Sequence, residues 1–264
     1  ALAFMSSWRR MKEITRYKVN FVLQVVMSFV WGLGFTIFAT VVDPGKLQSM
    51  IGTSNYLVFA LIGLAFQAYQ GASNYGAWEI HDELTRGQIE YTFASPVSRY
   101  FYILSSSLSD AIISTAFPLM PLFTIAILFA GSLPSLTAIA MTSVSIVLTF
   151  LALCQIGVII TSAPLLLKNV SALMSIFNFL LQIATGMLVP VQFLPEPFKV
   201  LAFVIPSTHG MDLARHFIMG TTTIWPVEVE LGGLVALLVA FGVLARLSTS
   251  YLERKAKAEG LSMA

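Results

Sequence analysis

Long apolar stretches alternate with short polar segments along this chain. Apolar runs of span length occur near positions 20–42, 55–78, 103–129, 135–163, 170–191 and 230–248. A bilayer core about 30 Å thick requires about 20 apolar residues at a rise of about 1.5 Å each. The runs are too long and too continuously apolar for the strands of a membrane β-barrel. The pattern therefore predicts an all-α, polytopic membrane protein with six transmembrane helices, in which residues 1–264 form a single transmembrane domain.

The basic residues predict how these helices are oriented. If the N-terminus is cytoplasmic, twelve of the fifteen Lys and Arg residues fall on the cytoplasmic side, and only Lys46, Lys199 and Arg215 fall outside. Short cytoplasmic segments of membrane proteins carry such an excess of positive charge. We therefore expect a protein of the cell membrane with both termini in the cytoplasm.

The segment before the first apolar run has an amphipathic pattern. Phe4, Trp8 and Met11 recur at helical spacing, whereas charged residues fall on the opposite side. This pattern predicts an interfacial helix over residues 1–18 that contacts membrane lipids. The alternative is a solvated tail whose positive charges only set the topology.

Two connections are long enough to have a function of their own. One is predicted at 79–99 on the cytoplasmic side, and the other at 192–229 on the outer side. The outer segment is rich in proline, and its apolar stretch 198–205 is too short to cross a bilayer. We expect short re-entrant helices there, interrupted by proline because this residue breaks helical hydrogen bonding.

Composition and missing motifs exclude several functions. Apolar residues make up 57% of the chain and charged residues 11%, against roughly a quarter charged in soluble domains. A net charge of +2 gives no reason to expect nucleic-acid binding. Cys154 is the only cysteine, which leaves no disulfide framework, and the separated His81, His209 and His216 predict helix packing rather than a metal site. We predict no cofactor, no metal and no catalytic residue in this chain.

The chain also has no motif for binding ATP phosphates and no serine-hydrolase elbow, so any ATP hydrolysis must come from a partner. Asp110 is the one clear ionisable candidate inside an apolar run, and a proton-coupled carrier would be expected to show more. Asp110 either marks such a route or is hydrogen-bonded at the membrane interface.

Uncharged polar residues recur at helical spacing within three of the runs. The set is Asn20 and Gln24 in the first run, Gln67, Gln70 and Asn74 in the second, and Asn178 and Gln182 in the fifth. Each stripe places one helix face away from lipid. These faces either line a translocation path or simply join neighbouring helices.

The cytoplasmic connection carries a family resemblance. Residues 83–99 read Glu-Leu-Thr-Arg-Gly-Gln-Ile-Glu-Tyr-Thr-Phe-Ala-Ser-Pro-Val-Ser-Arg, which resembles the connection after the second span in permeases of the type-two ABC exporter family. Gln88 departs from the more usual Thr. The resemblance implies a coupling helix that contacts an ATPase, with site residues Glu83, Arg86, Gly87, Glu90, Pro96 and Arg99. Gly87 would permit close approach, and Pro96 would end the helix.

The outer segment is similar to the same family, whose short outer helices carry a Pro, a small residue, an acidic residue and an Arg. Pro206, Gly210, Asp212 and Arg215 occupy that pattern. The resemblance covers essentially the whole chain. It implies a dimer, with a second copy or a homologous permease, seated on two cytoplasmic ABC ATPase subunits that bind ATP and magnesium.

These observations predict the permease subunit of an ATP-driven exporter. A path lined by Phe, Met, Asn and Gln with almost no charge favours a lipophilic or amphiphilic substrate, such as a drug or a lipid, although polysaccharide is carried by the same architecture. One alternative is an ATP-independent channel or secondary carrier, which leaves the coupling motif unexplained. Another is a membrane scaffold protein, in which the polar stripes would tolerate substitution by Leu.

Overall fold

The computed structural model describes positions 19, 22, 23, 26, 27 and 30, and residues 43–87, 98–115, 119–130, 133–162, 170–187 and 189–259. All regular structure within these ranges is helical, which confirms the all-α prediction for this part of the chain. The predicted interfacial helix 1–18 lies outside the described residues. So do four of the predicted site residues, namely Asn20, Gln24, Glu90 and Pro96.

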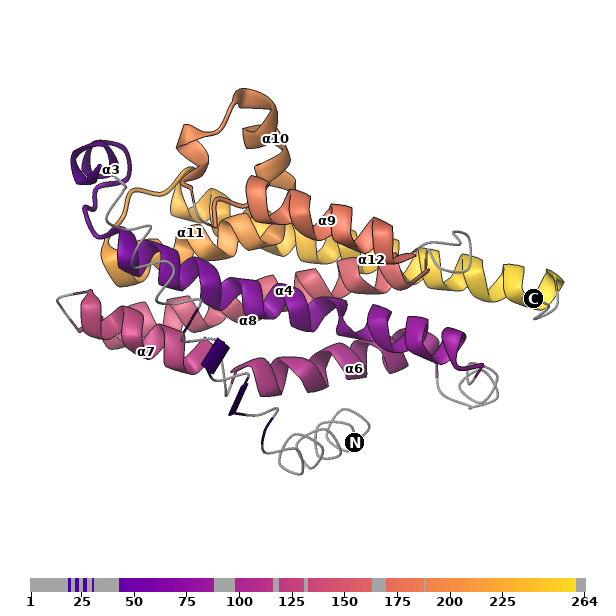
Figure 1. Cartoon of the computed structure of the whole chain (residues 1–264). Coiled ribbons are helices and arrows are strands. Elements are labelled where there is room, and N and C mark those ends of the chain that lie inside the picture. The colour runs from indigo at the N-terminus through magenta and orange to yellow at the C-terminus, as the bar shows by residue number, and fades with distance from the viewer. Residues whose placement is uncertain are drawn as a thin grey trace.

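The long helices lie side by side in an elongated bundle, as Figure 1 shows. In chain order the elements are α3 (Pro44–Ile51), α4 (Tyr56–Thr85), α6 (Arg99–Ser114), α7 (Met120–Phe129), α8 (Leu136–Ser162), α9 (Val170–Ala184), the 3-10 helix η3 (Val191–Phe193), α10 (Glu196–Val204), α11 (Pro206–Met219) and α12 (Val227–Glu259). α8 packs against α4, α11 and α12, and α4 also packs against α6 and α7.

The bundle has two distinct ends. One carries α3, η3 and α10, and we call it the α10 end. At the other, α4 ends beside Arg86 and α6 begins, and we call it the Arg86 end (Figure 1). The chain runs along α4 to the Arg86 end, returns through α6 and α7, and repeats this alternation through α8, α9 and α12. The chain reverses its direction in the connections between successive apolar runs.

Three of these helices are long and apolar enough to cross a membrane. They are α4 over Tyr56–Ile80, α8 over Leu136–Ile160 and α12 over Val227–Tyr251, which correspond to the predicted runs 55–78, 135–163 and 230–248. The run 103–129 is divided between α6 and α7, and the run 170–191 is helical up to Ala184. The total of six spans stays a prediction.

Short helices do occupy the proline-rich segment 192–229. Pro197 lies in the first turn of α10, and α11 begins at Pro206. Proline favours such positions because the first helical N–H groups have no partner within the helix. α11 ends where Gly220 adopts a positive φ of 68° and donates its N–H to the His216 carbonyl at 2.9 Å. With 9 residues, α10 is too short to span a bilayer.

Small residues allow α4 and α8 to approach closely. A side chain at Gly157 would overlap the carbonyl oxygen of Ser73, so only glycine fits there. The same carbonyl accepts a hydrogen bond from the Ser107 hydroxyl of α6 at 3.1 Å. Three helices therefore meet at one backbone position, as is typical of helix packing in membranes.

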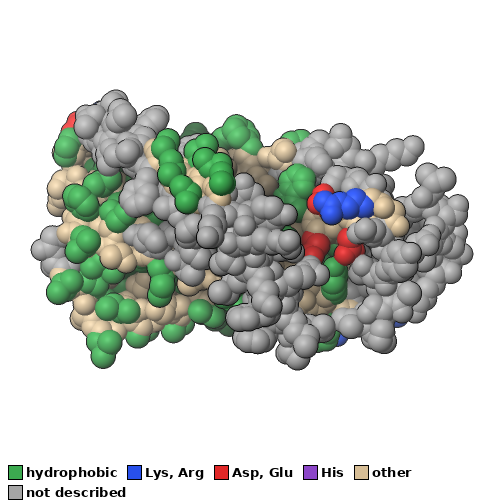
Figure 2. Space-filling view, turned by 60° about the horizontal axis from the view of Figure 1, so that its bottom comes forward, with side chains coloured by type: hydrophobic (Ala, Val, Ile, Leu, Met, Phe, Trp, Pro, Cys, Tyr) green, Lys and Arg blue, Asp and Glu red, His purple; other side chains and the backbone are tan. Residues whose placement is uncertain are grey.

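Much of the outer surface is apolar. Only 11% of the α12 span is buried, and Val235, Val239, Val243 and Leu247 form an exposed stripe along it. On the face shown in Figure 2, the hydrophobic side chains drawn lie mainly over the part of the bundle toward the α10 end, whereas most of the charged side chains drawn gather toward the Arg86 end. An apolar surface of this extent suits contact with lipid or with another apolar surface.

Candidate functional site

Two of the predicted polar stripes meet between α4 and α9. The side-chain amide of Asn74 donates to the Asn178 side-chain oxygen at 2.8 Å. Gln70 lies one helical turn before Asn74 and is buried, and its Nε2 has no hydrogen-bond partner among the described residues. Gln67 is half-buried and Gln182 is exposed. The structure thus joins Asn74 with Asn178 and leaves Gln182 accessible on α9.

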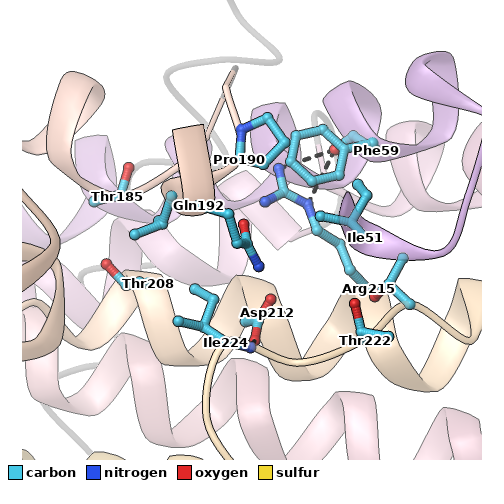
Figure 3. Close-up of a pocket in the computed structure, with 12 residues that line it drawn as sticks. Ile51, Phe59, Thr185, Pro190, Gln192, Thr208, Asp212, Arg215, Thr222 and Ile224 are labelled. Carbon is cyan, nitrogen blue, oxygen red and sulfur yellow. Dashed lines mark hydrogen bonds between the residues drawn. The ribbon is translucent and has the colours of Figure 1, made fainter. Parts of the chain in front are cut away.

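Arg215 is the central buried charge of the α10 end. Its side chain extends from α11, and the residue is 4% exposed. The guanidinium donates two hydrogen bonds to the carbonyl of Phe59, from Nε at 3.2 Å and from Nη2 at 3.0 Å. It also donates from Nη1 to the carbonyl of Gly186 at 2.9 Å and from Nη2 to the carbonyl of Met187 at 2.8 Å. Its Cζ lies 3.4 Å from the centre of the Phe59 ring (Figure 3). Arg215 therefore ties α11 to α4 and to the segment after α9.

Asp212, one turn earlier on α11, holds the segment after that helix. Its Oδ2 accepts the backbone N–H of Ile224 at 2.7 Å. α11 lies outside the three span candidates. Burial raises the pKa of Asp212 to about 7, and the hydrogen bond from the N–H of Ile224 opposes this shift. Burial lowers the pKa of Arg215 to about 9, opposed by the nearby Asp212. The guanidinium stays protonated at neutral pH.

The two other residues of the predicted outer motif position this helix. Pro206 begins α11 and is buried. Gly210 faces α8, where a side chain would overlap the Thr149 hydroxyl. All four residues of the motif therefore lie on α11 within the fold, and none is a surface loop residue.

A buried pair that the sequence analysis missed lies beside this motif. His209 of α11 contacts the Oε2 of Glu230, in the first turn of α12, through Nδ1, and both side chains are fully buried. The Nε2 of His209 contacts the Phe203 carbonyl at 2.8 Å. The other Glu230 oxygen accepts the backbone N–H of Trp225 at 3.3 Å.

The hydrogen-bond partners of His209 determine how many protons the pair of His209 and Glu230 carries. A carbonyl only accepts, so Nε2 carries a hydrogen. The contact between Nδ1 and the Glu230 carboxyl group then requires one proton, carried by either partner. The pair is neutral overall in both arrangements, which lowers the cost of burying it. One feature of the sequence could have indicated this buried pair. Glu230 is an acidic residue at the start of an apolar run, and no basic residue lies within four positions of it.

At the Arg86 end, the predicted coupling residues divide into two kinds. The Tyr102 hydroxyl of α6 donates to Glu83 Oε1 of α4 at 2.6 Å, so Glu83 belongs to the helix packing. Arg86 forms an exposed pair with Asp82 at 3.2 Å. Gly87, also exposed, has a positive φ of 66°. Arg99 is the first residue of α6.

The first turn of α6 contacts two further helices. The Tyr100 hydroxyl donates to Gln155 of α8 at 2.9 Å. The Cζ of Arg246 on α12 lies 5.0 Å from the ring centre of Tyr100 and 5.7 Å from that of Phe101. Together with the bond from Tyr102 to Glu83, these contacts link the start of α6 to α4, α8 and α12.

Comparison with known proteins identifies the family. The sequence model of the ABC-2 family transporter proteins matches residues 36–247, which is most of the chain and includes the polar contact, the α11 cluster and the Arg86 end. The chain belongs to the ABC-2 transporter family. No curated protein matches the chain. As an ABC-2 permease, it is a multi-pass membrane component of an ABC transporter, and membership implies ABC ATPase subunits as partners in general.

Proposed function

We propose that this ABC-2 permease is the membrane subunit of an ATP-driven exporter. Two copies, or one copy and a homologous permease, enclose the translocation path. Separate cytoplasmic ATPase subunits bind ATP and magnesium and contact the segment 79–99. The observation that carries this proposal is the sequence of residues 83–99, which resembles the coupling connection of this family. It is supported by hydrogen bonds from the first turn of α6 to α4 and α8 and by its cation–π contact with α12.

These bonds suit the transmission of force. A displacement of the connection between Gly87 and Arg99 moves the start of α6. Tyr102 passes this movement to Glu83 of α4, and Tyr100 passes it to Gln155 of α8. Packed side chains with fixed partners move together as a unit. Glu83 thus acts within the permease, whereas Arg86 and Glu90 are proposed to contact the ATPase.

The charge distribution supports a cytoplasmic Arg86 end. Arg86, Arg246 and Arg254 lie on elements that end there, while Lys46 and Lys199 belong to the short helices of the α10 end. On the positive-inside rule we propose that both termini lie in the cytoplasm. The proposal keeps six spans and an interfacial helix over 1–18. The short helices η3, α10 and α11 then form the outer re-entrant segment.

We propose that the polar stripes line the path. Gln182 is exposed on α9 beside the exposed apolar side chains of Phe179 and Ile183. A surface that offers an amide among apolar groups suits an amphiphilic molecule such as a drug or a lipid. One turn before Gln182 on α9, Asn178 accepts the hydrogen bond from Asn74.

Co-purification from mildly solubilised membranes tests the proposal. We expect ATP-hydrolysing subunits to accompany the intact chain and to be lost from a Glu90→Lys variant. Lys199→Glu is the matched control, because it reverses a charge at the opposite end and should retain the ATPase. If no ATPase accompanies the intact chain, the exporter proposal fails.

A second variant tests transmission separately from docking. Tyr102→Phe removes the hydroxyl that bonds to Glu83 and leaves the ring in place. We expect this variant to retain the ATPase subunits but to lose part of the substrate stimulation of ATP hydrolysis. Unchanged stimulation would exclude Tyr102 from the transmission route.

A further inference from the structure

An arginine lies on the exposed surface of α12, inside its apolar segment. Arg246 belongs to the span candidate Val227–Tyr251 and is five positions from its last residue, about 7–8 Å along a helix that rises about 1.5 Å per residue. Arg246 is exposed, as are Val243 and Leu247 beside it. A charge on the surface of a span is unfavourable unless it reaches the membrane interface, where headgroups and water solvate it. The position of Arg246 near the end of the span places its charge at that interface.

Two aromatic rings of α6 hold this arginine in place. Its Cζ lies 5.0 Å from the ring centre of Tyr100 and 5.7 Å from that of Phe101, and both distances are within the range of about 6 Å for a cation–π contact. The two rings meet edge to face with their centres 5.4 Å apart. Tyr100 is itself fixed by its hydrogen bond to Gln155. The charge of Arg246 is therefore held at one position against α6.

The face of α12 that carries Arg246 changes from apolar to basic along the helix. Val239 and Val243 are exposed on it. Ser250 and Arg254 follow Arg246 at intervals of four residues, and both are exposed on the same face. Arg254 lies beyond the span candidate. This face thus combines apolar side chains at the depth of acyl chains with two arginines at and beyond the interface.

Charge complementarity identifies what covers this face. A two-fold contact with a second copy brings the same patch of both chains together, so the arginines of one copy would face those of the other. A phospholipid has the opposite pattern, with acyl chains for the valines and a phosphate for the arginine. The planar guanidinium fork matches the geometry of phosphate oxygens, and basic residues at the membrane surface attract anionic lipids.

We propose that Arg246, Tyr100 and Phe101 form a binding site for an anionic phospholipid. The lipid phosphate contacts the guanidinium of Arg246, and the acyl chains lie along Val239 and Val243. The bound lipid connects α12 to the start of α6 on the outer surface of the bundle. The site requires only the folded permease, so this inference does not depend on the exporter proposal or on the transported molecule.

Native mass spectrometry of the purified permease, titrated with single lipids, tests the site. We expect the intact chain to bind phosphatidylglycerol more tightly than phosphatidylcholine, which has a phosphate but no net charge. Arg246→Gln should weaken the binding of phosphatidylglycerol by about 5-fold, the change expected for one basic residue near an anionic lipid surface. Equal affinity of the intact chain for the two lipids would overturn the proposal.

Arg86→Gln is the matched control for charge. It also removes one positive charge at the Arg86 end, but Arg86 directly follows α4 and is not part of α12. This variant should bind phosphatidylglycerol as tightly as the intact chain does. If both variants weaken the binding equally, the effect belongs to the net charge and the proposed site is refuted.

Thermal unfolding in detergent gives a second measurement, which includes the role of the rings. A ligand that binds only the folded protein raises the unfolding midpoint. Added phosphatidylglycerol should raise the midpoint of the intact chain and of Arg86→Gln, raise it less in Phe101→Leu, and leave it unchanged in Arg246→Gln. A rise in Arg246→Gln equal to that of the intact chain would overturn the site, and an equal rise in Phe101→Leu would overturn the role of the rings.

Discussion

The two ends of the bundle hold their charged groups in opposite ways. At the α10 end, Arg215, Asp212, His209 and Glu230 are all buried, and each is hydrogen-bonded to backbone as well as, for His209 and Glu230, to each other. At the Arg86 end, the side chains of Arg86 and Asp82 are 66% and 59% exposed. The first arrangement fixes the shape of the permease, and the second leaves charge available to another protein.

The difference follows from solvation. A buried charge without partners is very unfavourable, so each one requires hydrogen bonds that only one arrangement of helices provides. An exposed pair is solvated whether or not it forms, and it contributes little to stability. The effect of a substitution on the free energy of unfolding should therefore be about ten times larger at the α10 end than at the Arg86 end.

The largest effect is expected from Arg215→Leu. This change leaves the carbonyls of Phe59, Gly186 and Met187 without their donor and should lower the free energy of unfolding by about 3–5 kcal/mol. Arg215→Lys keeps the charge but loses the planar donor geometry, so an intermediate loss is expected. Thermal unfolding of the purified protein in detergent measures both. A loss as small as that of an Arg86 variant would end the distinction between the two ends.

A pair of glycines on α4 gives the next test. A side chain at Gly63 would overlap the Met187 carbonyl and come within 2.9 Å of Nη2 of Arg215, whereas nothing lies within 4 Å of a side chain added at Gly71. Gly63→Ala should therefore destabilise the protein by about 1–3 kcal/mol. Gly71→Ala should stabilise it by about 0.5–1 kcal/mol, because alanine favours the helix. Equal effects at both sites would show that the α10 end repacks freely.

The α10 end should also respond to pH. Burial alone lowers the pKa of His209, but the bonds to Glu230 and to the Phe203 carbonyl raise it above 6.5 overall. A raised pKa contributes stability below the unfolded value and loses it as pH rises through the folded value. The pKa of Asp212 is raised from 3.8 to about 7. The contribution of Asp212 to stability is therefore also lost as pH rises between these two values. Stability should therefore fall as pH rises toward and above 7, by at most about 1.4 kcal/mol per pH unit for each proton released.

Variants separate these two contributions to the pH response. In Asp212→Asn, the fall in stability between about pH 4 and 7 should be smaller. The contribution of His209 to the fall in stability above pH 6.5 should remain. The Arg86→Gln variant should keep the full pH response of the intact chain. A pH profile unchanged in both His209→Gln and Asp212→Asn would assign the response to other groups.

The smallest effect is expected at the Arg86 end. Arg86→Gln removes an exposed pair between residues four positions apart and should change the free energy of unfolding by only about 0.3–0.5 kcal/mol. The same variant should nevertheless weaken ATPase co-purification if the segment is the contact surface. A stability loss above 2 kcal/mol would show that this end, too, depends on its charges for folding.

Local features of the sequence were sufficient for several of the helices, although they did not predict α3 or the division of the run 103–129 between α6 and α7. Runs of about 20 apolar residues predicted α4, α8 and α12, and the prolines at 197 and 206 predicted the short helices α10 and α11. Residues of α4 and α9 were predicted to share a polar character, and Asn74 with Asn178 proved to be in contact. Helical periodicity shows which residues share a face but does not reveal which helix lies opposite that face.

By itself, the sequence determined the all-α class, the membrane as solvent and the family, because apolar length, proline positions and a contiguous motif are properties of neighbouring residues. Only the tertiary structure decided the partners of the buried charges. Arg215 was counted among the outer charges, yet it bonds to Phe59, 156 positions away, and His209 pairs with Glu230 across 21 positions. Such pairs form because burial removes water from the charged groups, and the replacement partners come from whichever helices the packing brings together.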